Sequence, residues 1–154
     1  MHNPYEDKLC DQLATYLSKG LNYHLDAFNK DNPHLKLWDK AVIGFRSYDA
    51  FDVPLNEFPL LKVFRVADNF KPRSDKSVVS LRCSYCLAYP DLDKLNTMMS
   101  WAAKIINLLL INCLDNELDI ISPPGGYSAS YQTFMGQNGQ PVYAFLSFSF
   151  NVID

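Results

Sequence analysis

The chain has 154 residues, a length that fits one domain of ordinary size. With 48% hydrophobic and 20% charged residues, it has the composition of a folded protein and not of a disordered one. The net charge of -3 argues against a protein that coats nucleic acid through a basic face, so we expect no specific nucleic-acid recognition. Residues 1–7 lack the basic start and apolar stretch of a signal peptide, and the longest apolar run, residues 105–111, is far shorter than the roughly 20 residues of a membrane span. We therefore expect no membrane partner and assembly in a cytoplasm.

The first predicted element is an amphipathic helix over residues 4–28. Asn3 is a suitable cap and Pro4 suits the first helical position. Gly20 lies inside the pattern and costs about 1 kcal/mol relative to alanine, so the helix is expected to stop or bend there. The apolar stripe, spaced by three and four residues, consists of Leu9, Leu13, Tyr16, Leu17, Leu21, His24 and Phe28.

The next segments read as strands. A short strand is predicted around residues 41–45 and another over residues 60–67, followed by a turn or long hairpin loop over residues 68–76. Residues 77–89 give the clearest strand, because odd positions are apolar or aromatic while even positions include Ser80, Arg82 and Ser84. Such alternation predicts one buried and one wetter face, as in an antiparallel sheet.

The second half of the chain begins with a helix over residues 91–114. The second half of this helix is apolar on nearly all sides, which predicts that it is covered on more than one side. Residues 115–126 read as a solvated exit and a connection. Two further strands, 127–135 and 142–153, flank Asn138-Gly139, the strongest short-range hairpin signal. The prediction is an α+β fold in a single domain, residues 1–154: a mostly antiparallel sheet with two long helices packed on it and a C-terminal β-hairpin.

No group of residues argues for catalysis. Cys83 and Cys86 lie three apart on a strand, so their side chains point to opposite faces and are poorly placed to share a metal. All four cysteines are expected to be reduced, mostly buried thiols, and His24 a core or boundary side chain. The glycine-rich residues 124–127 lack the lysine and following helix of a phosphate loop. We therefore expect no enzyme, with no catalytic residue, no cofactor and no bound metal.

One segment is unusually basic. Residues 62–76 carry a local charge of +3, which leaves -6 on the rest of the chain. This asymmetry suits head-to-tail assembly, in which a positive edge of one protomer meets a negative surface of the next; a solvated hairpin loop is the alternative interpretation. The candidate subunit or partner interface residues are Lys62, Arg65, Lys71 and Arg73.

The order of these features is that of a known family. A leading amphipathic helix is followed by the strand Phe58-Pro59-Leu60-Leu61-Lys62-Val63-Phe64-Arg65 and by a long alternating strand. A helix begins after Tyr89-Pro90-Asp91, and an aromatic hairpin ends the chain. The chain in this respect resembles the tail terminator (tail completion) proteins of tailed bacteriophages and related contractile particles.

The resemblance implies a structural virion protein located in the tail or neck and assembled in the host cytoplasm. It implies a homo-oligomeric ring, usually a hexamer, that caps the tail tube and joins the tail to the neck or head connector. Its partners would be the tail tube protein and neck or connector proteins, with the sheath as a further candidate. Two alternatives stay open: another tail or neck component, such as a tube or connector ring protein, and a small α+β enzyme or ligand-binding domain.

Overall fold

The structure is a computed structural model. It describes residues 8–35, 43–46, 59–70, 72–73, 75–89, 92–113, 119–121, 128–134 and 142–153.

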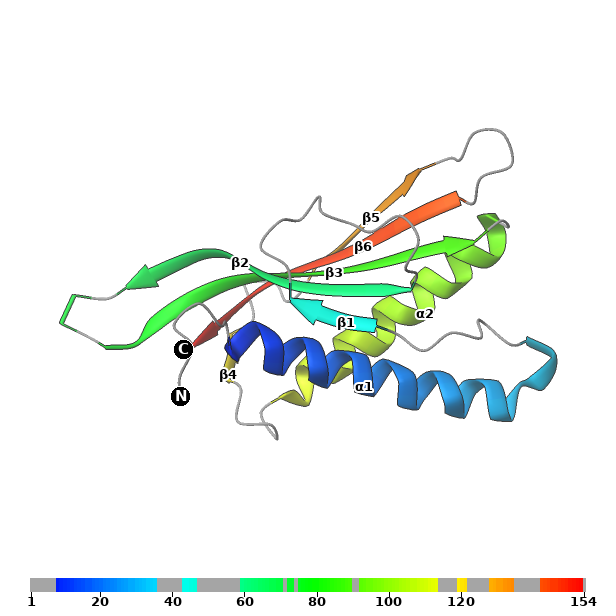
Figure 1. Cartoon of the computed structure of the whole chain (residues 1–154), viewed down its shortest axis with the longest axis horizontal. Helices are drawn as coiled ribbons and strands as arrows, with labels where there is room; N and C mark the ends of the chain where they lie inside the picture. The colour runs from blue at the N-terminus through cyan, green and yellow to red at the C-terminus, as the bar shows by residue number, and fades with distance from the viewer. Residues whose placement is uncertain are drawn as a thin grey trace.

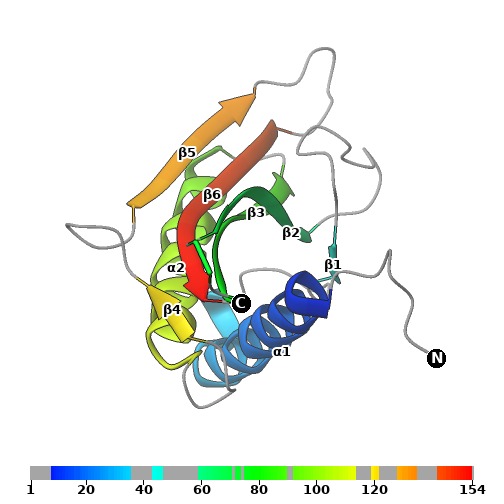
Figure 2. The same cartoon turned by 90° about the vertical axis from the view of Figure 1, so that its left-hand side faces the viewer.

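Two long helices cover one face of a sheet (Figures 1 and 2). Helix α1 spans Lys8–Asp31 and helix α2 spans Leu92–Ile111, and a short 3-10 helix, η1, follows α1 at Pro33–Leu35. The Tyr16 hydroxyl donates a 2.7 Å hydrogen bond to the carbonyl oxygen of Leu109. The rings of Phe28 and Trp101 are in an edge-to-face arrangement with their centroids 6.2 Å apart. These contacts hold α1 against α2 while both helices bury their apolar stripes against the sheet.

α1 runs through Gly20, in agreement with the predicted span of residues 4–28 and without the stop that glycine could introduce. The helix continues through this residue to Asp31, and the predicted cap and first turn at residues 3–7 lie outside the described residues. A Cβ atom on Gly20 would lie only 2.5 Å from Cδ2 of Leu109. Glycine is therefore a contact residue that lets α2 approach α1 closely, and not a helix stop.

The described strands form one six-stranded sheet in the order β1-β2-β3-β6-β4, with β5 also paired to β6. β1 is parallel to β2, and all the other pairings are antiparallel. The fold class is therefore α+β with a mostly antiparallel sheet, as predicted, and β5 and β6 form the C-terminal hairpin. The strands are β1 (Ile43–Arg46), β2 (Leu60–Phe70), β3 (Ser77–Tyr89), β4 (Asp119–Ile121), β5 (Ser128–Phe134) and β6 (Val142–Ile153).

The centre of the sheet is the pairing of β3 with β6, which runs from Val78 opposite Ile153 to Tyr89 opposite Val142. Both strands have the predicted bounds, and their apolar alternation confirms the core face. The side chains that these two strands bury in the core are Val79, Leu81, Cys83, Tyr85, Leu87, Ala144, Leu146, Phe148, Phe150 and Val152.

Two boundaries correct the prediction. β2 does not end at Ala67 but continues to Phe70, past a β-bulge between Arg65 and Ala67, because it stays paired with β3 along this length. The expected turn or loop over residues 68–76 therefore begins three residues later, because residues 68–70 belong to β2. β4, which the sequence placed in a connection, forms because three residues pair with the end of β6, with Ile120 opposite Val152.

The second face of the sheet is also buried at one end, which the prediction of a wetter face missed. Ser84 and Cys86 of β3 are buried, and so are their partners across the strands, Lys62 and Leu60 of β2. Arg82 is exposed, as the alternation predicted. The wetter face of β3 is thus limited to its first half.

Candidate assembly surface: the β2–β3 arm

The most distinctive surface is a hairpin that extends beyond the N-terminal end of α1 (Figure 1). We call it the β2–β3 arm: the described residues among 66–78, which are the second half of β2, the turn and the start of β3. The burial of β2 changes abruptly along its length, because residues 60–64 are buried and residues 66–70 are all exposed. The core therefore supports the base of the arm and leaves its end in solvent.

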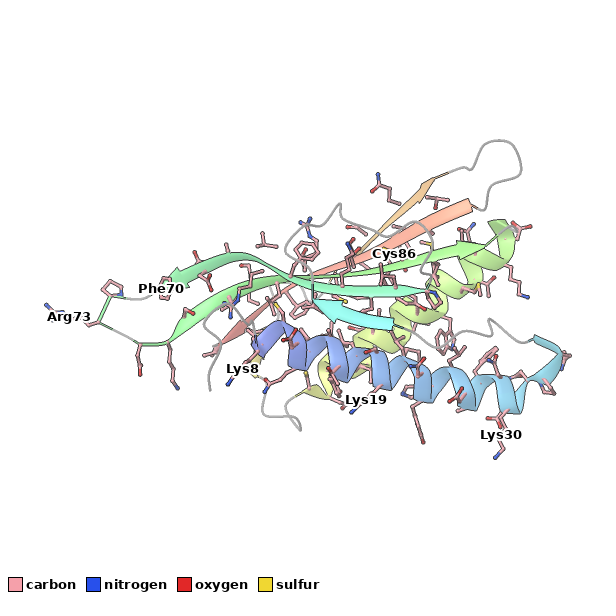
Figure 3. The ribbon with its side chains drawn as sticks, in the orientation of Figure 1. Lys8, Lys19, Lys30, Phe70, Arg73 and Cys86 are labelled. Atoms are coloured by element: carbon pink, nitrogen blue, oxygen red, sulfur yellow. The ribbon has the colours of Figure 1, made fainter. Side chains whose placement is uncertain are left out.

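The turn of the arm is closed by the pairing of Phe70 with Ser77. Arg73 at the tip has a φ of 63°, a left-handed conformation that is uncommon for a residue other than glycine. Residues 72–73 lie in a turn, so Arg73 is located where the chain reverses between β2 and β3, and its side chain is exposed. Figure 3 shows Phe70 and Arg73 at the far end of the arm, well away from Lys19 and Lys30 on α1.

The structure separates the four basic residues that the sequence grouped. Arg73 is exposed at the tip, whereas Lys62 is 0% exposed on the second face of β2 and is not on the surface of the protomer. We therefore withdraw Lys62 from the predicted interface. Lys71 lies outside the described residues.

Arg65 lies at the base of the arm and has a contact within its own chain. Its Nη1 atom donates a 2.7 Å hydrogen bond to Oδ1 of Asp68, and both side chains are partly exposed. A pair of this kind at the surface contributes little to stability, about 0–1 kcal/mol. Asp68 cancels the charge of Arg65 locally, and the described charged groups farther out on the arm are Arg73, Asp75 and Lys76.

Sequence reasoning missed the apolar side chains of this surface. Val66 is 55% exposed and Phe70 is 72% exposed, both on a strand that has left the core. The available signal was two large apolar residues in a basic segment, but Val66 was placed in the predicted strand over residues 60–67 and Phe70 in the loop over residues 68–76. Exposed apolar groups beside charges are typical of interaction surfaces.

The cysteines pack as predicted. Cys83 lies on the core face with Leu81 and Tyr85, and Cys86 on the opposite face, so the two thiols do not face each other. All four cysteines are buried and none forms a disulfide. Burial raises the pKa of Cys83 to about 12 and that of Cys113 to about 11.

Cys86 lies beside polar groups of β2 and β3. Its sulfur lies 4.0 Å from the Ser84 hydroxyl oxygen. Burial raises the pKa of Cys86 to about 11, against the opposing effects of the Ser84 contact and the nearby Lys62 ammonium. A thiol with this pKa is protonated at neutral pH and is a poor nucleophile.

An open groove of about 690 Å³ lies along α1 and includes His24, Lys19 and Leu109 among its lining residues. His24 is half-buried, in accord with the predicted boundary position. Its ring lies edge to face with that of Tyr23, with the ring centroids 5.4 Å apart. Thr15, a hydroxyl in the same groove, is nine residues away along the helix, about 13 Å of helical rise. The groove therefore does not bring that hydroxyl to the imidazole as a nucleophile and base.

The described part of the chain contains no group of three or more histidine, cysteine, aspartate or glutamate side chains that could hold a metal ion. Neither α1 nor α2 is long and apolar enough to cross a membrane.

Comparison of the chain with protein-family models and with curated proteins found no match. A function for this protein consequently has to be proposed from its fold, its surface and the resemblance described above.

Proposed function

We propose that this protein is a tail terminator: a structural virion protein whose protomers form a closed ring that caps the tail tube and joins the tail to the neck. The observation that carries the proposal is the β2–β3 arm, which exposes Val66, Phe70 and Arg73 beyond the core. A surface of this kind suits contact with another protein more than it suits catalysis. The tail-terminator resemblance supplies the kind of assembly.

In this proposal, the arm of one protomer contacts a different surface of the next. Such a head-to-tail contact is heterologous and closes into a ring when the rotation between protomers divides a full turn. Arg73 contributes by meeting an acidic group of the neighbour, at about 1 kcal/mol or less while the pair stays hydrated. The apolar side chains of the arm contribute the larger share through burial of their surface.

The proposal is tested by negative-stain imaging of the purified protein, alone and mixed with isolated tail tubes. We expect closed rings, and rings seated at tube ends in the mixture. Long tubes formed by the pure protein would instead identify a tube protein. A protein that stays monomeric alone and beside tail tubes would contradict the proposal.

The contribution of the arm charge is tested with Arg73→Glu. We expect the variant to weaken the ring, with a lower assembled fraction at equal protein concentration, and raised salt to weaken the wild-type ring in the same direction because exposed charges are screened over about 8–10 Å. Lys30→Glu, at an exposed position in the last turn of α1, makes the same charge change away from the arm and is the matched control. Equal ring fractions for the two variants would remove Arg73 from the interface.

A further inference from the structure

The sheet has two edges at which the described residues place no partner strand. On one side, β1 pairs only with residues 60–63 of β2, so no described strand lies beside residues 66–70. On the other side, one edge of β5 pairs with β6, and no strand of the described chain pairs with the outer edge of β5. Figure 2 shows β5 at the outer side of the sheet, with β3 and β6 between it and β2.

The two edges differ in the features that protect sheet edges in monomeric proteins: the β2 edge carries Asp68 and a β-bulge, whereas the β5 edge has neither a charge nor a bulge. Such edges are usually short or carry charges, prolines or covering segments, because their backbone groups otherwise pair with another chain. β5 has the sequence Ser-Ala-Ser-Tyr-Gln-Thr-Phe, without a charged residue, proline or glycine. Its residues 130–133 are exposed, and Tyr131 is 55% exposed.

The exposed apolar side chains of the described chain concentrate on these two edges. Of the six large hydrophobic residues that are exposed, Val66 and Phe70 lie on β2 and Tyr131 lies on β5. Three of six on two short edge segments is a concentration that the core does not require. Exposed apolar side chains on an edge strand favour coverage of that edge by another chain.

The strand directions make the two edges complementary. β5 is antiparallel to β6, β6 to β3, and β3 to β2, so β5 and β2 run in opposite directions within one sheet. A head-to-tail repeat that keeps the strand direction therefore places β5 of one protomer antiparallel to β2 of the next. Antiparallel strands form the hydrogen-bond ladder that continues this sheet.

The side chains also fall on matching faces. Phe70 is opposite Ser77, and Tyr131 is opposite Leu146, and these partners belong to the face of the sheet that carries the core. In a continued sheet, Phe70 and Tyr131 would share this face. Aromatic side chains on one face of adjacent strands reach each other at direct or diagonal spacing.

We propose that the sheet continues from one protomer to the next, with residues 66–70 of β2 paired to β5 of a second copy of this chain. The inference rests on the proposed ring and names the contact that would build it. Because each protomer offers one β2 edge and one β5 edge, the contact is heterologous and every edge is used only when the ring closes.

The test uses introduced cysteines at the two edges, because the four native thiols are buried. Asn69 is opposite Val78, and Ser130 is opposite Ser147, which puts both on the face away from the helices. We expect Asn69→Cys and Ser130→Cys chains to form a disulfide-linked dimer on mild oxidation only when mixed. The double variant should form a ladder of linked chains up to the ring size on a non-reducing gel.

The controls separate this inference from the proposed function. Asn69→Cys combined with Ser100→Cys, an exposed position on α2, should stay unlinked. Gln132→Cys lies two residues from Ser130 on the same face of β5. It tests whether β2 and β5 pair in a register shifted by two residues, and it replaces any Ser130 variant that fails to fold. Rings by negative stain without links from Asn69 to either β5 position would overturn the edge pairing and leave the ring proposal standing. Efficient linking of Ser130→Cys chains to each other would show a symmetric β5 pair and would also overturn the edge pairing. A protein that is strictly monomeric would overturn both the edge pairing and the ring proposal.

Discussion

The hydroxyl of Tyr85 lies in the core without a hydrogen-bond partner among the described residues. Burial, and to a smaller extent the neighbouring Cys86, raises the pKa of Tyr85 well above its ordinary value, so the group is neutral. A buried hydroxyl without a partner has lost its hydration and gained nothing in return.

We therefore expect Tyr85→Phe to leave the free energy of unfolding unchanged or to raise it by about 1 kcal/mol. Tyr85→Ala is the comparison, because loss of the whole ring should lower the free energy by about 3–5 kcal/mol. Urea denaturation followed by circular dichroism measures both. A decrease of more than 1 kcal/mol for Tyr85→Phe would mean that the hydroxyl makes a hydrogen bond in solution.

The buried thiols give a dependence of stability on alkaline pH. Thiols in the unfolded chain ionise around pH 9, whereas burial keeps Cys83, Cys86 and Cys113 protonated to about pH 11 or above. Between these values the folded state binds more protons than the unfolded state, so the free energy of unfolding falls as the pH rises. Each thiol contributes at most about 1.4 kcal/mol per pH unit.

We expect urea denaturation under reducing conditions to show stability that is constant near pH 7–8 and decreases from about pH 9 to pH 11. Cys86→Ser removes one ionising group at a position beside Ser84 and should make the decrease shallower. A flat profile up to pH 10.5 would contradict the assignment of these thiols to the core.

The residue scale also shows where sequence reasoning ends. The core position of Cys83 followed from simple alternation along β3. The prediction for Lys62 was wrong: this lysine between apolar neighbours was assigned to the surface, but it is buried on the second face of the sheet. The alternation of one strand reports which side chains share a face, but it does not report whether that face is covered.

At the scale of elements, the contact between α1 and α2 depends on Gly20. A larger side chain would meet Leu109, whose own side chain is buried. We expect Gly20→Val to lower the free energy of unfolding by about 1–3 kcal/mol through overpacking.

Lys19→Val, at the adjacent exposed position of α1, is the matched control and should change the stability by about 0.5 kcal/mol or less. Thermal and urea denaturation of the two variants measure the difference. Equal stabilities would show that Leu109 moves aside and that Gly20 is not required for close helix packing.

The bounds of the long strands with a clear alternation of apolar and polar residues were predicted best. β3 and β6 carry twelve or more residues of alternation, and their bounds agree with the sequence. The polar pair Asp68 and Asn69 reads locally as a turn, yet both residues stay in β2 because they pair with Val79 and Val78. β4 has only three residues, and its pairing with the end of β6 is a long-range property that no local pattern contains.

At the scale of the whole molecule, the α+β class followed from the order of helical and alternating segments. The candidate surface was predictable only in part. Residues 62–76 were identified by their charge, whereas the apolar groups of the arm and the β5 edge required the exposure of each side chain in the folded chain. The architecture places one core-anchored hairpin and one uncharged edge at different sides of the sheet, and the proposed head-to-tail ring would use both.

The central claim, a ring built through the β2–β3 arm, is tested most directly by the mass of the particle in solution. Light scattering should be measured on the wild type and on a variant in which residues 70–77 are replaced by Asn-Gly, which shortens the arm beyond the paired residues Asn69 and Val78. We predict that the wild type has a mass that is a whole multiple of the 17.6 kDa chain, six in the hexamer that the resemblance implies, and that the shortened variant has the mass of one chain and keeps the circular dichroism of a folded protein. A wild-type monomer, or a shortened variant that keeps the wild-type mass, would contradict the account.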